Sequence, residues 1–351
     1  MKILFDRIDE PGLNTLEVYE RRGGYESLRR ALRMAPDEVL KQLVNSGIRG
    51  RGGAGFRMGQ KISFLPHGDM DKYLVCNADE SEPGTFKDRE IMQKNPHMLI
   101  EGILIASWAG EISRTFLYIR GEYAHQADIL EAAIAEARDA GYIGEKILGS
   151  DHSVSLVLHR GAGAYICGEE TGLLDSLEGK RGNPRLKPPF PAIEGLYHGP
   201  TLINNVETLA TVPAIIRMGG EDYAKLGTET STGTKLVSIS GDVQRPGNYE
   251  IELGIPSRDI IYGLAGGPFE GREVKFWFPG GSSSPVLTKD DLDVPYDFDS
   301  MAMPIGSMIE KFRDELEAEI EAARKRSGAG DLKDVIPLGV ADEYAGPMPV
   351  H

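Results

Sequence analysis

The sequence predicts an α/β protein with a mostly parallel sheet and helices on both faces. Apolar runs of strand length occupy residues 72–76, 115–119 and 154–158, and segments with helical spacing of apolar residues, 97–109 and 124–140, separate them. Strands that alternate with helices favour parallel pairing, because the crossover between parallel strands takes a dozen or more residues. A sheet of this kind binds ligands at the carboxyl ends of its strands.

Before the first strand, the sequence predicts two short helices and a glycine-rich loop. Residues 1–24 show no clear periodicity and are expected to be irregular, whereas residues 25–34 and 36–45 are expected to be helical. Gly47 then ends the second helix and opens a loop over residues 47–59.

A second glycine-rich turn, residues 161–165, follows the third strand and leads into a predicted helix at 169–177. Residues 184–200 are rich in proline and are expected to form a loop. Residues 205–218 are expected to be helical again.

From residue 235 the pattern changes to short strands separated by turn residues. The strands are expected at residues 235–239, 248–252 and 274–278, with a small helix at 258–265, a turn at 279–284 and a highly charged helix at 310–326. The predicted domains are an α/β domain over residues 1–234, a small β-rich module over 235–300, and a C-terminal helix and tail over 304–351.

Composition excludes several classes of protein. Acidic residues outnumber basic ones by 54 to 39, which argues against a nucleic-acid binder. The apolar run at the N-terminus is too short for a secretory signal, and the apolar stretch 98–109 contains Glu101 and is too short to span a bilayer. The expected location is cytoplasmic, or peripheral to a membrane complex.

The cysteines and histidines predict no metal site. Cys76 and Cys167 are the only two cysteines, and two cannot hold a Cys₄ iron–sulfur cluster. They are expected to be buried free thiols rather than a disulfide. The seven histidines have no ligand spacing, so zinc enzymes are not supported.

The first motif with chemical meaning is RGRGGAGF at residues 49–56. Its four glycines let the backbone approach a ligand and point N–H groups at an anion, and Arg49, Arg51 and Lys61 would add positive charge. The alternative is a surface turn. The motif is neither a Walker A loop nor a standard Rossmann fingerprint, because no Gly-Lys-Ser/Thr follows and a helix precedes it.

Two more motifs follow predicted strands. Residues 77–82 are acidic and come directly after the first strand, where ligands sit in open α/β sheets; the alternative is a solvated acidic loop. Residues 160–171 form a strand, a glycine turn and a helix start that suit a phosphate or a flat ring. Tyr165 could stack there, whereas Glu169 and Glu170 could simply cap the helix.

The last two motifs are less specific. Prolines around Lys187 and Phe190 would hold these side chains in place, although the segment could be a rigid linker. Asn204 stands near a predicted helix start and could serve as its N-cap.

Taken in order over residues 19–302, five runs of sequence resemble one family. They are GIRGRGGAGF at 47–56, CNADESEPGTFKDR at 76–89, RGAGAYICGEETGLLDSLEGKRGNPRLKPPFPA at 160–192, INNVETLA at 203–210 and PGGSSSPVL at 279–287. The family that they resemble is the NADH-binding, FMN-containing flavoprotein of respiratory complex I, the F-subunit of the bacterial NADH–quinone oxidoreductase.

The resemblance implies FMN as prosthetic group, NADH as substrate and hydride transfer from nicotinamide C4 to flavin N5. The positions that match NAD contacts are Gly50, Arg51, Gly52, Gly53, Ala54, Gly55, Phe56, Gly59, Phe64, Lys187 and Phe190. The positions that match FMN contacts are Gly52, Lys61, Asn77, Asp79, Glu80, Gly161, Gly163, Tyr165, Gly168, Glu169, Glu170, Asn204, Asn205 and Thr208.

Lys61, Glu82 and Glu170 are expected to be the catalytic residues by this resemblance, acting through positioning and electrostatics, because no nucleophile is needed. Residues 235–286 are expected to be a ubiquitin-like β-grasp module. The implied partner is the thioredoxin-like [2Fe–2S] protein of the same complex, its E-subunit, and the implied location is peripheral to the inner membrane.

The chain departs from the family in one respect. The family continues into a helical domain whose Cys-rich motif binds a [4Fe–4S] cluster, and this sequence contains none of it. Residues 304–315 resemble the family's C-terminal helix, which follows the cluster domain, so an internal deletion after Ala302 is expected. Two alternatives fit the same residues: an inactive nucleotide-binding remnant that only binds partner subunits, or the diaphorase subunit of an NAD-linked hydrogenase or formate dehydrogenase.

Overall fold

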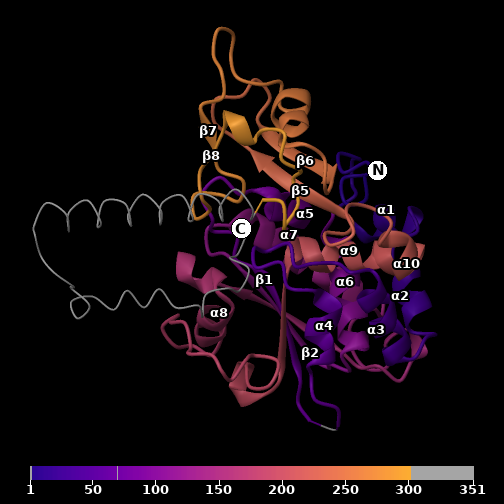
Figure 1. The fold of residues 1–351 in the computed structure, drawn as a ribbon. Coiled ribbons are helices and arrows are strands. Elements are labelled where there is room, and N and C mark those ends of the chain that lie inside the picture. The colour runs from indigo at the N-terminus through magenta and orange to yellow at the C-terminus, as the bar shows by residue number, and fades with distance from the viewer. Residues whose placement is uncertain (1, 69, 302–351) are drawn as a thin grey trace, which may run out of the picture.

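The centre of the molecule is a four-stranded parallel sheet (Figure 1). The computed structural model describes residues 2–68 and 70–301, so the charged helix expected at 310–326 lies outside the described residues. The strands are β1 (Tyr73–Ala78), β2 (Arg114–Ile119), β3 (Ser155–Arg160) and β4 (Thr201–Asn205), in the order β3-β2-β1-β4. The predicted α/β fold with a parallel sheet is confirmed.

The sequence pattern misses β4. Only two of its five residues, Leu202 and Ile203, are aliphatic, and a proline-rich segment precedes it. The strand forms because it pairs along its length with β1, with Tyr73 opposite Thr201 and Asn77 opposite Asn205.

Side chains of the sheet enter two cores, one on each face. Leu74, Cys76 and Ala78 of β1 point into the larger core. The helices of this face are α5 (Lys87–Lys94), α6 (Pro96–Ala109), α7 (Ala124–Asp139) and α9 (Val206–Met218). Tyr73 and Val75 point into the smaller core, under α8 (Glu170–Leu177). Helices therefore cover both faces, as predicted, and α5 is a helix that the sequence pattern misses.

Helix α6 is buried on nearly every side. A Cβ at Gly102 would collide with the carbonyl oxygen of Leu209, so this glycine lets α6 and α9 pack closely. The buried carboxylate of Glu101 accepts backbone N–H bonds from Tyr25 at 3.0 Å and Leu28 at 2.9 Å. Among the described residues, no helix is long and apolar enough to cross a membrane.

Four short helices lie at the start of the chain: α1 (Leu16–Arg21), α2 (Glu26–Ala31), α3 (Pro36–Asn45) and α4 (Met58–Ser63). A fifth, α10 (Gly220–Tyr223), follows α9. The expectation that residues 1–24 are irregular is wrong for α1, whose six residues are too few for a periodic pattern. Gly59 lies inside α4 rather than in the predicted loop, and a Cβ there would sit 2.6 Å from the Val44 backbone nitrogen, so it allows α4 to pack on α3.

Residues 234–301, here called the β module, lie at one end of the molecule (Figure 1). They contain β5 (Thr234–Ile239), β6 (Gly247–Glu252), the π-helical segment η4 (Asp259–Leu264), β7 (Phe276–Trp277) and β8 (Leu287–Thr288). In the described residues β5–β6 and β7–β8 form two separate antiparallel ribbons, so the ubiquitin-like arrangement stays a prediction. Glu250 of β6 holds the N-terminal segment by accepting the N–H groups of Ile3 and Phe5, each at 2.8 Å.

Candidate functional site

The strand order reverses between β1 and β4, whose carboxyl ends therefore lie side by side. The chain runs from β1 outward to β2 and β3 and then returns to the far side of β1 as β4. In open α/β sheets, ligands bind where the strand order reverses in this way. Asn77 is the penultimate residue of β1, Asn204 and Asn205 are the last two residues of β4, and the acidic segment 79–82 follows β1 directly.

A cluster of alternating charges gathers side chains from three parts of the chain. The Lys61 ammonium of α4 lies 3.0 Å from a Glu170 oxygen and donates to the Ile203 carbonyl oxygen of β4 at 2.9 Å. Lys187, from the proline-rich loop, lies 2.7 Å from Glu170 and 3.1 Å from Glu169. Helix α4, the start of α8 and the proline-rich loop therefore converge in space through these four side chains.

The two neighbouring glutamates at the start of α8 have different environments. Glu169 is the N-cap of α8 and accepts the backbone N–H groups of Thr171 and Gly172, each at 2.8 Å. The capping alternative is therefore confirmed for Glu169. Among the described residues, the Glu170 carboxylate instead accepts hydrogen bonds from Lys61 and Lys187 alone. Burial raises the pKa of Glu170, but the two ammonium groups outweigh it and lower the pKa to about 2.

This shift predicts how Glu170 contributes to stability. Its folded-state pKa lies below the ordinary value of 4.5, so the carboxylate stabilises the fold above pH 4.5, and this contribution is lost as the pH falls toward about 2. We expect the difference in urea midpoint between the wild type and Glu170→Gln to stay constant from about pH 5 to about pH 9 and to shrink in acid. A matched substitution of the exposed acid Glu145 should show no such acid-sensitive difference. A difference that instead grows below pH 4.5 would contradict the shift.

Four aromatic rings are exposed on the segments that carry or adjoin these charged residues. The Phe56 and Phe64 rings lie 6.0 Å apart at an interplanar angle of 47°, and each is about half exposed. Tyr165 and Phe190 are more than half exposed. Large exposed rings on a protein surface are typical of a site that stacks on a flat ligand.

The two asparagines of β4 have different roles. Asn205, not Asn204, is the N-cap of α9, so the capping prediction for Asn204 is wrong: α9 begins at Val206, one residue later than predicted. Asn205 also donates to the Asp88 carboxylate at 2.6 Å, so the oxygen and the nitrogen of its side-chain amide each have a partner inside the protein. The Asn204 amide nitrogen is buried and has no hydrogen-bond partner among the described residues. Such a group needs an acceptor, and a bound cofactor with carbonyl or phosphate oxygens would supply one.

Close contacts join the motifs at the carboxyl ends of β1 and β4. The Asn77 side chain of β1 donates to the Gly168 carbonyl oxygen at 2.9 Å and accepts the Asp79 N–H at 3.1 Å. Thr208 accepts the Arg51 backbone N–H at 2.8 Å. A Cβ at Gly52 would sit only 2.9 Å from the Asn205 Cβ, so the glycine loop lies directly against the end of β4.

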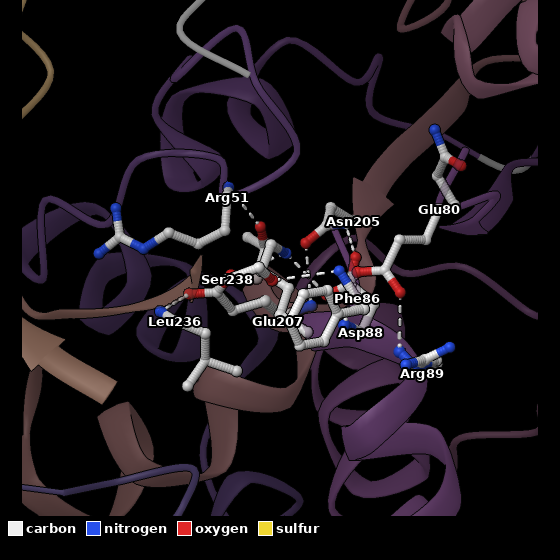
Figure 2. A network of polar contacts seen from close by, with 12 residues as sticks. Arg51, Glu80, Phe86, Asp88, Arg89, Asn205, Glu207, Leu236 and Ser238 are labelled. Atoms are coloured by element: carbon white, nitrogen blue, oxygen red, sulfur yellow. Dashed lines mark hydrogen bonds and ion pairs between the residues drawn. The ribbon is translucent and has the colours of Figure 1, made fainter. Parts of the chain in front are cut away.

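Glu80 supports the fold rather than presenting a free carboxylate (Figure 2). Its oxygens accept the N–H groups of Asp88 at 2.7 Å and Arg89 at 3.0 Å, in the first turn of α5, and also the Tyr123 hydroxyl. Burial and the nearby Asp88 raise the pKa of Glu80 to about 7. An FMN contact through its side chain, as expected from the resemblance, would have to displace these bonds.

A buried ion network joins α5, α9 and β5 beneath the glycine loop (Figure 2). The Glu207 carboxylate is fully buried, lies 2.8 Å from the Lys87 ammonium and accepts the Leu236 N–H at 2.7 Å. Lys87 also lies 2.7 Å from Asp88. Burial lowers the pKa of the neighbouring Lys235 to about 8.

The arginines of the glycine loop face the β module. Arg51 is buried and donates to the Thr232 carbonyl oxygen at 2.7 Å, so its expected positive charge is not presented to a ligand. Arg49 lies 3.0 Å from Asp299 and 4.5 Å from the centre of the Phe298 ring. A Cβ at Gly55 would sit 2.8 Å from that ring. Sequence reasoning misses Phe298 and Asp299, because only the folded chain brings them to the loop.

Both cysteines are buried free thiols, as predicted, with Cys76 in β1 and Cys167 before α8. In residues 2–68 and 70–301, no group of three or more His, Cys, Asp or Glu side chains is arranged to hold a metal ion.

Comparison with known proteins decides the family. Residues 43–214 match the family model of the Nuo51 FMN-binding domain. The F-subunit of NADH-quinone oxidoreductase from Streptomyces coelicolor is 53% identical over 302 residues, which are 86% of this chain and 67% of that protein. The chain belongs to the F-subunit family of NADH-quinone oxidoreductase. The F-subunit of Aquifex aeolicus is 46% identical over 85% of this chain and 70% of its own length. The F-subunit of Escherichia coli is 47% identical over 82% of this chain and 65% of its own length.

Solved structures of NAD⁺-reducing [NiFe]-hydrogenase resemble this member of the F-subunit family. In the H₂-reduced state the TM-score is 0.70 at 39% identity, over 76% of this chain and 45% of the hydrogenase chain. In the air-oxidised state the TM-score is 0.72 at 37% identity, over 85% of this chain and 49% of the hydrogenase chain. The chain thus spans about half the length of these hydrogenase chains. The predicted family, its FMN-binding domain and its oxidoreductase class are confirmed.

Proposed function

We propose that this chain oxidises NADH by hydride transfer to FMN bound at the carboxyl ends of β1 and β4. The observation that carries the proposal is the buried amide nitrogen of Asn204, which has no hydrogen-bond partner within residues 2–68 and 70–301. Asn204 lies one residue from the Lys61–Ile203 bond, inside the matched FMN-binding domain. When bound there, FMN would supply the redox chemistry as the acceptor of hydride.

Three groups of residues would hold FMN. Asn204 would donate its amide hydrogens to the cofactor, and the backbone of Gly52, which lies against the end of β4, would approach the cofactor closely. The glycine turn with Gly161 and Gly163 would also approach the cofactor closely. Gly163 has φ of +79°, which a larger residue would adopt only with strain. Lys61 would bring positive charge to the end of β4.

The dinucleotide would lie over the exposed rings. Phe56, Phe64 and Phe190 would stack on its flat groups, and Lys187, held by two glutamates, would meet its charged groups. Glu82 and Glu170 would act by position: both are held ionised, and two fixed carboxylates disfavour additional negative charge beside the nicotinamide.

Flavin absorbance tests the proposed function directly. Purified chain reconstituted with FMN should be yellow and should lose its visible flavin band when NADH is added. A protein that takes up no FMN would refute the flavin site. A protein that stays yellow with NADH would support the alternative of a non-catalytic nucleotide-binding remnant.

The aromatic surface gives a second test. Phe64→Ala should raise the KM for NADH about tenfold while flavin content is unchanged, because it removes a stacking partner of the dinucleotide. Phe269 of the β module, equally exposed but not near Phe56, provides the matched control Phe269→Ala, which should leave KM unchanged. Equal KM values for the two variants would exclude stacking on Phe64.

A diaphorase role in an NAD-linked hydrogenase is the second candidate. Its support is the likeness to NAD⁺-reducing [NiFe]-hydrogenase, with TM-scores of 0.70 and 0.72. The chemistry at the flavin would be the same, and co-purification with a hydrogenase rather than a quinone-reducing complex would distinguish the two.

Partners and location follow from the family as further proposals. We propose that the thioredoxin-like [2Fe–2S] protein of the same complex binds this chain and that the complex lies at the cytoplasmic side of the inner membrane.

With only Cys76 and Cys167 in this sequence, no Cys₄ cluster can form in the chain. We therefore expect turnover with an artificial acceptor such as ferricyanide and no iron–sulfur signal from the isolated chain.

A further inference from the structure

A turn of the β module touches a proposed catalytic residue. The turn, residues 279–284 between β7 and β8, provides two donors to the same oxygen of Glu82: the Ser283 N–H at 2.9 Å and the Ser282 hydroxyl at 3.2 Å. The other oxygen of Glu82 accepts the Tyr165 hydroxyl at 2.6 Å. Glu82 is thus held between the flavin domain and a segment 200 residues later in the chain.

The shape of the turn depends on one glycine. Gly281 has φ of +92°, a conformation that favours glycine. A Cβ at this position would also sit 2.6 Å from both Cγ and an oxygen of Glu82. Gly281 therefore serves two purposes: it permits the backbone conformation of the turn, and it leaves room for the Glu82 side chain against that backbone.

Hydrogen bonds within the β module fix the conformation of this turn. Ser284 is buried, accepts the Gly280 N–H at 3.1 Å and donates to the Gly281 carbonyl oxygen at 2.7 Å. The buried Tyr296 hydroxyl donates to the Pro279 carbonyl oxygen at 2.6 Å. The donors that face Glu82 are therefore held in position by the β module before any ligand binds.

We propose that the turn 279–284 is a positioning element of the NADH site, which holds the Glu82 carboxylate in one orientation through the Ser282 and Ser283 donors. This inference rests on the proposed function. This role of the turn makes the β module part of the substrate site and not only a neighbour of the flavin domain. Partial burial of Glu82 raises its pKa, but the bonds from Tyr165 and from this turn outweigh burial and keep the pKa below its ordinary range.

The test uses two glycines with the same backbone conformation. Gly281→Ala places a methyl group against Glu82, whereas Gly241→Ala is the matched control: Gly241 has φ of +98° and open space around its Cβ position. Both variants carry similar backbone strain, and only the first displaces Glu82. We expect Gly281→Ala to raise the KM for NADH about tenfold, as for loss of a hydrogen bond to a charged group, with normal FMN content and with Gly241→Ala near the wild type.

A double-mutant cycle separates positioning from general damage. If the turn acts through Glu82, Gly281→Ala should raise KM no further in a Glu82→Ala background than Gly241→Ala does there. The pH dependence of KM should also shift upward in Gly281→Ala, because Glu82 loses donors that favour its charged form. Additive effects on KM, or equal KM values for Gly281→Ala and Gly241→Ala, would overturn the inference. If wild-type flavin does not bleach with NADH, it is instead the proposed function that fails.

Discussion

Glu207→Gln should cost about 3–5 kcal/mol of the free energy of unfolding at neutral pH, the range measured when one partner of a buried ion pair is removed. The Glu207 carboxylate is fully buried and lies 2.8 Å from the Lys87 ammonium. Lys235 and Arg51 also contribute favourable charge to it. Glutamine keeps the shape of the side chain but removes its negative charge. The buried cations Lys87, Lys235 and Arg51 then have one carboxylate fewer to balance them. Urea unfolding followed by circular dichroism measures the loss.

The control for this prediction is an exposed ion pair of the same chemistry. Glu17 lies 3.8 Å from Arg21 on the surface of α1, and its side chain is 88% exposed. Glu17→Gln should change the free energy of unfolding by less than about 0.5 kcal/mol. Equal effects of the two substitutions would show that the network beneath the glycine loop does not stabilise the fold.

Lys61→Met should lower kcat/KM for NADH about a hundredfold, the effect expected when a fixed electrostatic donor is removed from a reaction site. The Lys61 ammonium bridges Glu170 and the Ile203 carbonyl oxygen, so it brings positive charge to the end of β4, where hydride transfer would deposit negative charge. Methionine keeps the length of the side chain but none of the charge. Steady-state reduction of ferricyanide, normalised to bound flavin, measures the effect.

Lys225→Met is the matched control for Lys61→Met. Lys225 pairs with Asp222 on the surface of α10, and its side chain is 76% exposed. The control should keep the wild-type rate. A Lys61→Met protein with full flavin content and an unchanged rate would show that this ammonium does not serve the reaction.

The sheet and most helices can be predicted from the sequence because they follow local periodicity. The predicted range for α3 matches the structure, and those for α6 and α7 differ from it by one residue. Elements defined by their partners are missed: β4 is a strand because β1 pairs with it, and α5 forms where the buried Glu80 accepts the N–H groups of its first turn. Gly59 likewise belongs to a contact between helices and not to the loop that its neighbours predict.

The candidate site likewise contains residues that the sequence identifies and contacts that only the fold reveals. Sequence motifs identify Lys61, Glu170 and Lys187, which the fold brings together. They do not reveal that the Arg51 guanidinium turns inward, or that Asn204 and Asn205 differ in their bonding, because both depend on residues distant in the chain. The turn at 279–284 is visible in the sequence as a turn, but its contact with Glu82 is not.

The packing of Phe298 against Arg49 and Gly55 has a practical consequence for anyone who divides this protein into fragments. A fragment ending at residue 234 would keep the matched FMN-binding domain, 43–214, and every glycine of the loop. It would lose the ring and the carboxylate that give the loop its shape, together with the donors to Glu82. The motifs of such a fragment would suggest more ligand binding than the fragment retains. The shortest functional fragment is therefore expected to extend beyond residue 299.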